Sequence, residues 1–159
     1  MNEQYMMRAI ELARLGEGLT RPNPPVGAVL VQDDKIIAEG WHKKAGGDHA
    51  ERDCLKSAIG DLKSAILYVT LEPCSTQGRT PPCTDLILEK GIGRVVVCVE
   101  DLNPKHAGRG LDILRDAGVE VVSGICGEAG RELIAPFEKF INMYVNFLEF
   151  FFYQLAGTI

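Results

Sequence analysis

The 159-residue sequence lacks a hydrophobic run long enough to cross a membrane. No stretch approaches the roughly 18 apolar residues that a spanning helix needs. The N-terminus, MNEQYMMRAIELARLG, is charged throughout and lacks the apolar segment of a secretory signal peptide. We therefore expect a cytoplasmic protein with no membrane partner.

An excess of basic residues is also missing. Lysine and arginine total 17 against 22 acidic residues, which gives a formal net charge of −5 at pH 7. Binding to a phosphate backbone usually requires the opposite balance, so we expect no nucleic-acid partner. A glycine-rich dinucleotide fingerprint is absent too, because Gly91-Ile92-Gly93 is only a helix end before a strand. We expect no NADPH binding in this chain.

The cysteines are odd in number and follow no signal peptide: Cys54, Cys74, Cys83, Cys98 and Cys126. In a reducing compartment, clustered cysteines hold metal more often than they form disulfides. Cys98 lies in an apolar run, and we assign it, Cys54 and Cys126 to the core. Cys74 and Cys83 remain as candidate metal ligands.

Strands and helices alternate along the chain, which has the length of one domain. The patterns predict strands at 26–32, 35–41, 65–71, 94–100 and 119–124. They predict helices at 6–15, 49–59 with Asp48 as its cap, 82–90, 110–118 and 127–142. The first two strands form a hairpin, and crossover helices separate the others. The prediction is an α/β fold with three α/β/α layers around a mixed, mostly parallel sheet of about five strands.

Residues 142–159, NMYVNFLEFFFYQLAGTI, hold four of the six phenylalanines. Exposed in a monomer, such a segment promotes aggregation. We expect it to dock on the body or on another subunit, as in a homodimer or larger homo-oligomer. The expected boundaries are a domain at 1–144 and an apolar tail at 145–159.

The strongest functional pattern is His49-Ala50-Glu51 followed by Pro73-Cys74 and by Cys83. One imidazole and two thiolates are the ligands of a catalytic zinc site that keeps its fourth position for water. Glu51, two residues after the proposed ligand, is placed to move protons without binding the ion. H-x-E followed by P-C…C is typical of zinc-dependent nucleobase deaminases. A structural zinc site or inert core thiols are the alternatives.

Several motifs resemble, in order, the deaminase domain of the riboflavin-biosynthesis family within the cytidine-deaminase-like superfamily. They are PNPPVGAVLV (22–31), the H-x-E, TLEPCS (70–75), the eight-residue spacing in PCSTQGRTPPC, and NPKHAGRG (103–110). The resemblance covers about residues 4–142. In that family the domain is usually fused to a C-terminal reductase.

The resemblance implies hydrolytic deamination of 2,5-diamino-6-(5-phosphoribosylamino)pyrimidin-4(3H)-one, a small phosphorylated pyrimidine, to 5-amino-6-(5-phosphoribosylamino)uracil. It places the zinc ligands at His49, Cys74 and Cys83 and the proton shuttle at Glu51. Its substrate-binding positions fall on Asn23, His42, Arg79, Asp101 and Asn103. The chemistry supports some of these independently, since the Asn23 amide can read a pyrimidine edge and the Arg79 guanidinium can bind a phosphate.

The sequence departs from the family beside the pocket, at Asp53, Thr76 and Gln77, and no reductase motif follows residue 144. We expect any reductase to be a separate partner or a missing part. Deamination of another nucleoside, a base or tRNA is an alternative function. A zinc-stabilised interaction module that uses the tail is another.

Overall fold

The computed structural model describes residues 2–78, 80–101, 107–139 and 143. Within them, five strands form one sheet in the order β2-β1-β3-β4-β5. The strands are β1 (Gly27–Gln32), β2 (Lys35–Trp41), β3 (Ile66–Leu71), β4 (Arg94–Val99) and β5 (Glu120–Ser123). This arrangement leaves β2 and β5 at the two edges.

Strand β1 is antiparallel to both of its neighbours, β2 and β3. Strands β3, β4 and β5 are parallel to one another. Four strands therefore run in one direction and β1 runs in the other, as the sequence predicted. Asp33 and Asp34 have φ angles of 50° and 56°, and they form the tight turn of the hairpin that the sequence predicted.

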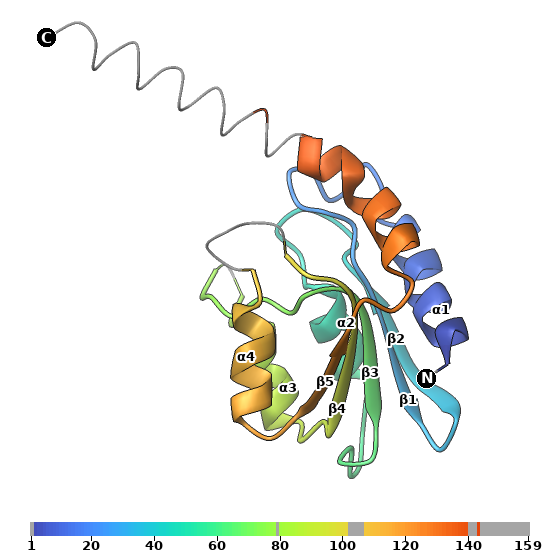
Figure 1. The fold of residues 1–159 in the computed structure, drawn as a ribbon, viewed down its shortest axis with the longest axis vertical. Helices are drawn as coiled ribbons and strands as arrows, with labels where there is room; N and C mark the ends of the chain where they lie inside the picture. Colours follow the sequence, from blue (N-terminus) through green and yellow to red (C-terminus); the bar gives the residue numbers. More distant parts are fainter. Residues whose placement is uncertain (1, 79, 102–106, 140–142, 144–159) are drawn as a thin grey trace, which may run out of the picture.

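The helices cover both faces of the sheet (Figure 1). Helix α1 (Glu3–Arg14) and a helix at 127–139 lie on one face. On the other face lie α2 (Ala50–Lys56), α3 (Cys83–Glu89) and α4 (Arg109–Asp116). The predicted three-layer fold is therefore confirmed, and each face of the sheet has its own apolar cluster.

Helix α2 approaches the sheet very closely at Gly40 in β2. A Cβ atom at Gly40 would lie 2.3 Å from the backbone nitrogen of Cys54 in α2, a distance that no side chain tolerates. Buried Cys54 and Leu55 complete this contact. Helix α2 is thus packed directly against β2.

Two details differ from the sequence prediction. Helix α2 begins at Ala50 with His49 at its N-cap position and no side-chain cap, so Asp48 is not the cap. The Asp48 carboxylate instead forms an ion pair with Lys56 at the end of the same helix. Cys126 is only half-buried, packed at the margin of the apolar cluster that α1 covers, whereas Cys54 and Cys98 are fully in the core.

The proposed tail at 145–159, and with it the boundary after residue 144, lies outside the described residues. None of the helices among the described residues has the length and apolar character needed to span a bilayer.

Candidate active site

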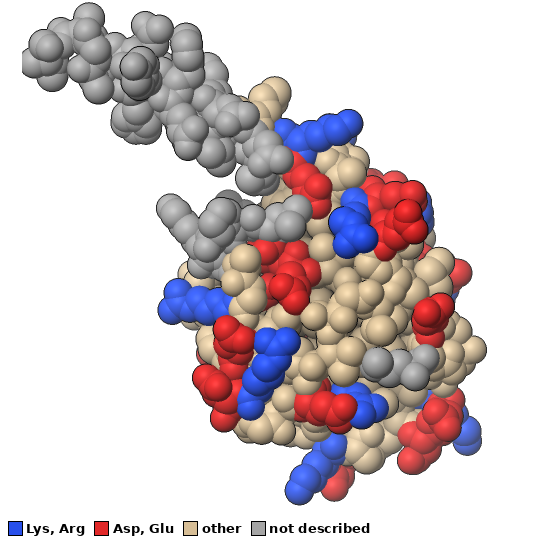
Figure 2. Space-filling model, in the orientation of Figure 1, with Lys and Arg blue, Asp and Glu red and all other residues tan. Residues whose placement is uncertain are grey.

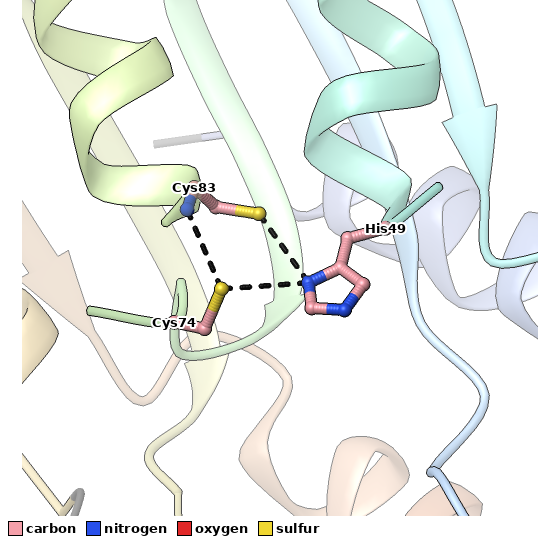
Figure 3. A group of neighbouring side chains, drawn as sticks. All are labelled: His49, Cys74 and Cys83. Carbon is pink, nitrogen blue, oxygen red and sulfur yellow. Dashed lines mark hydrogen bonds between the residues drawn. The ribbon is translucent and has the colours of Figure 1, made fainter. Parts of the chain in front are cut away.

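Three side chains that are far apart in the sequence meet at one end of the sheet (Figure 3). His49 lies directly before α2, Cys74 follows β3, and Cys83 is the first residue of α3. The His49 Nδ1 atom is 3.4 Å from the Cys74 sulfur and 3.5 Å from the Cys83 sulfur. The three ligand atoms all lie within 4.8 Å of one another. The structure thus brings together the three residues predicted to bind zinc.

The geometry of this cluster fits a zinc ion. A tetrahedral zinc with bonds of about 2.3 Å to sulfur and about 2.0–2.1 Å to nitrogen separates these ligand atoms by about 3.6 Å. The two nitrogen–sulfur distances match that separation. One imidazole and two thiols are also a donor set that zinc prefers.

The sulfur of Cys74 is prepared to carry negative charge. The Cys83 thiol and the His49 imidazole donate to it, which lowers the pKa of Cys74. The backbone N–H of Cys83, at the N-terminus of α3, points at the same sulfur from 3.4 Å. Because Cys83 shares its proton with Cys74, the pKa of Cys83 is raised. The contact with Cys74 raises the pKa of His49. A cation in the centre would replace these shared protons.

Glu51 lies in the first turn of α2, two residues after His49, and is only 3% exposed. Burial raises its pKa to about 7, and the neighbouring Cys74 thiolate adds to the effect. A carboxyl group with a pKa near neutrality can both accept and donate a proton. This is the property required of the residue predicted to shuttle protons.

A pocket of about 210 Å³ opens beside the cluster. His49, Glu51 and Cys74 line one part of its wall. Its other lining residues include three of the predicted substrate-binding positions: Asn23, His42 and Asp101. Arg79 and Asn103, the other two predicted positions, lie outside the described residues.

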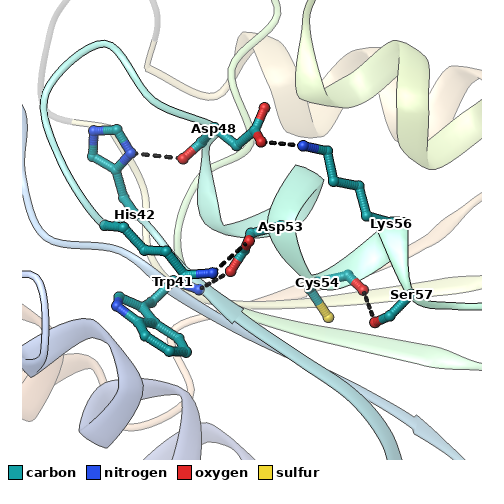
Figure 4. Close-up of polar contacts among 8 residues, drawn as sticks. Trp41, His42, Asp48, Asp53, Cys54, Lys56 and Ser57 are labelled. Atoms are coloured by element: carbon teal, nitrogen blue, oxygen red, sulfur yellow. Dashed lines mark hydrogen bonds and ion pairs between the residues drawn. The ribbon is translucent and has the colours of Figure 1, made fainter.

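His42 lines this pocket, and its ring centroid lies 5.6 Å from that of His49. Its Nδ1 atom is 2.8 Å from the carbonyl oxygen of Asp48, so Nδ1 carries the hydrogen and donates it (Figure 4). Within the described residues, Nε2 has no hydrogen-bond partner, although the side chain is 3% exposed. A buried, unpaired acceptor of this kind suits a polar ligand group.

Asp53 contacts the residues on both sides of His42. One of its carboxylate oxygens accepts from the backbone N–H of Trp41 at 3.3 Å, and the other pairs with Lys43 at 2.9 Å. The Lys43 ammonium also lies over the Trp41 ring. The departure from the family pattern at Asp53 therefore has a local structural role.

Sequence reasoning did not select Glu72 or Phe137, which also line the pocket. Phe137 comes from the helix at 127–139, and a single aromatic residue in an amphipathic helix carries no functional signal. Glu72 belongs to the quoted TLEPCS motif, where an acidic residue between an apolar strand and a proline was the available signal.

Comparison with known proteins identifies the family of this chain. A model of the cytidine and deoxycytidylate deaminase zinc-binding region matches residues 1–99. The chain belongs to that family. Its relatives include the riboflavin biosynthesis protein RibD of Aquifex aeolicus, which is 50% identical over 89% of this chain. The chain spans 40% of the length of that relative.

Another relative is matched over nearly its whole length. The diaminohydroxyphosphoribosylamino-pyrimidine deaminase of Buchnera aphidicola is 46% identical, and the match covers 85% of this chain and 92% of the relative. Among solved structures, a diaminohydroxyphosphoribosylaminopyrimidine deaminase/5-amino-6-(5-phosphoribosylamino)uracil reductase from Thermotoga maritima superposes with a TM-score of 0.85 at 49% identity. That match covers 89% of this chain and 41% of the solved chain. The family resemblance inferred from the motifs is confirmed.

Proposed function

We propose that this chain hydrolytically deaminates 2,5-diamino-6-(5-phosphoribosylamino)pyrimidin-4(3H)-one to 5-amino-6-(5-phosphoribosylamino)uracil and releases ammonia. The observation that carries the proposal is the placement of Glu51, a buried acid with a pKa near 7, beside the cluster of His49, Cys74 and Cys83. The similarity to deaminases of this class in Buchnera and Thermotoga supports the choice of substrate.

The side chains divide the reaction between them. His49, Cys74 and Cys83 would hold zinc, which when bound supplies a Lewis acid that makes water nucleophilic at neutral pH. Glu51 accepts a proton from the water that attacks the amine-bearing ring carbon, and donates it to the adjacent ring nitrogen. Glu51 then transfers a second proton from the added hydroxyl group to the leaving amine. Water is consumed and ammonia is released, which balances the reaction.

The other wall of the pocket recognises the substrate in this proposal. The Asn23 amide can donate to and accept from the pyrimidine edge, and His42 Nε2 can accept from a hydroxyl or amino group. Arg79 and Asn103 remain predictions from the family resemblance. Acidic and basic side chains are interspersed on the face drawn in Figure 2, which together with the net charge of −5 favours a small substrate over tRNA.

The test combines metal analysis with an ammonia-release assay on the pyrimidine ribotide, cytidine and guanine in parallel. We expect about one zinc per chain and ammonia from the ribotide. Release from cytidine or guanine and none from the ribotide would assign another substrate. A chelator should abolish activity before the fold is lost, whereas unfolding at the same chelator concentration would indicate a structural metal.

A further inference from the structure

Glu72 is a buried carboxylate at the pocket. It follows Leu71, the last residue of β3, and precedes Pro73 and Cys74. Its side chain lines the pocket and the residue is 7% exposed. A carboxylate buried to this degree is unfavourable unless hydrogen-bond donors surround it.

Among the described residues, three backbone N–H groups supply such donors. Glu72 Oε1 accepts from Gly110 at 2.8 Å, and Oε2 accepts from Gly108 at 2.9 Å and from Asp101 at 3.1 Å. These partners are 29 to 38 residues away in the sequence. Hydrogen bonds to a charged acceptor are stronger than neutral ones. One side chain therefore fastens the chain on both sides of residues 102–107.

The start of α4 depends on this carboxylate. The N-cap residue of α4 is Gly108, which has no side chain that could accept from the first N–H groups. Glu72 performs that role from outside the helix, and its negative charge lies at the positive end of the helix dipole.

A second contact joins the same two segments. A Cβ atom at Gly110 would lie 2.2 Å from the carbonyl oxygen of Pro73, so α4 approaches the chain directly before Cys74 as closely as a glycine permits. This close approach and the hydrogen bonds to Glu72 are independent observations. Together they tie the backbone of Asp101, which lines the pocket, to the segment that carries a zinc ligand.

We propose that Glu72 is a positioning residue that sets the substrate-binding wall of the pocket, through Asp101 and the start of α4, at a fixed distance from the metal cluster. The proposal rests on the deaminase function proposed above. Glu72 accepts three N–H groups and takes no proton in the reaction, so its loss should weaken substrate binding more than it slows chemistry.

Glu72→Gln tests the proposal with little change in volume. One oxygen becomes an NH₂ group, which faces backbone N–H groups that need an acceptor. We expect the KM for the pyrimidine ribotide to rise by about tenfold or more, kcat to change by less than about threefold, and zinc content to stay unchanged. Hydrogen exchange at the amides of Asp101, Gly108 and Gly110 should become about tenfold faster.

Glu39→Gln is the matched control, because Glu39 pairs with Arg8 on the surface of α1 and β2. It should change neither KM nor exchange at those three amides. Gly110→Ala, which pushes α4 away from Pro73 without changing a charge, is the second variant and should also raise KM. If Glu72→Gln does not fold, Gly110→Ala decides the proposal.

Several results would overturn the proposal. Unchanged exchange at the three amides would show that the Glu72 contacts do not hold these segments. An unchanged KM despite faster exchange would remove the role in substrate binding, and loss of zinc with unchanged KM would assign Glu72 to the metal cluster. The exchange measurement needs no substrate, so an inactive wild-type protein would refute the proposed function without affecting this readout.

Discussion

The two walls of the pocket hold their residues by different means. On the metal wall, His49 lies directly before α2 and Glu51 lies in the first turn of that helix. Cys83, the first residue of α3, completes the metal cluster. On the substrate wall, His42 and Asp101 lie beyond strand ends and are held through contacts with Asp48 and Glu72. The metal wall is thus built from helix ends, whereas the substrate wall depends on hydrogen bonds between distant segments.

This difference predicts different effects on catalysis. Substitutions on the metal wall should abolish turnover, whereas substitutions on the substrate wall should weaken substrate binding and leave kcat nearly normal. Substitutions in each wall, compared with substitutions outside both, can test this separation.

The largest effect is expected from Cys83→Ser. A serine hydroxyl stays protonated at neutral pH and is a poor zinc ligand, so zinc affinity should fall by at least about a hundredfold and ammonia release should disappear. Metal analysis after dialysis measures the first and the coupled assay the second. Cys126→Ser is the control, since Cys126 lies at the far side of the sheet and should retain both properties. Full zinc content in Cys83→Ser would contradict the assignment of Cys83 as a zinc ligand.

Glu51→Gln should separate chemistry from metal binding. The amide cannot accept the proton from water, so kcat should fall by about 10²–10⁴-fold. Zinc content should remain at the wild-type value, because Glu51 is not among the three ligands. Glu89→Gln, an exposed change at the end of α3, is the control. Undiminished turnover in Glu51→Gln would remove this residue from the mechanism.

His42→Ala probes the substrate wall. The loss of one buried hydrogen-bond acceptor should raise KM by about tenfold, with kcat within about threefold of wild type. Steady-state kinetics on the ribotide measure both values. A large fall in kcat at unchanged KM would mean that the two walls are not separate in function.

The smallest effect is expected outside the pocket, at the Arg8–Glu39 ion pair. The Arg8 guanidinium lowers the pKa of Glu39, so the pair stabilises the fold above the ordinary glutamate pKa and loses this contribution as the pH falls through the lowered value. Between about pH 7 and about pH 3, wild type should lose less than about 1 kcal/mol more unfolding free energy than Glu39→Gln. Urea unfolding at both pH values checks this. A larger difference would show that this exposed ion pair stabilises the fold more than its exposure predicts.

The sequence predicted the metal wall because its information is local and chemically specific. His49, Glu51, Cys74 and Cys83 are the residue types that the reaction requires, in the expected order, and alternating strands and helices indicated the layers. The prediction failed at Asp48, whose carboxylate pairs with Lys56 eight residues later while its carbonyl orients His42. A preference for helix caps does not distinguish these outcomes.

Glu72 could not be interpreted from the sequence for a different reason. Its partners are backbone N–H groups, which every residue except proline possesses, and they lie far along the chain. Only the fold shows that this carboxylate meets the glycines before and within α4. The positions predicted at Arg79 and Asn103 lie outside the described residues and remain predictions.

His49 directly precedes α2 and Glu51 lies in its first turn, where the helix packs so closely on β2 that Gly40 leaves no room for a side chain. The spacing between the His49 imidazole and the Glu51 carboxylate is therefore set within one short segment of the chain. Changes to the opposite wall would therefore alter which molecules fit the pocket and leave this spacing intact.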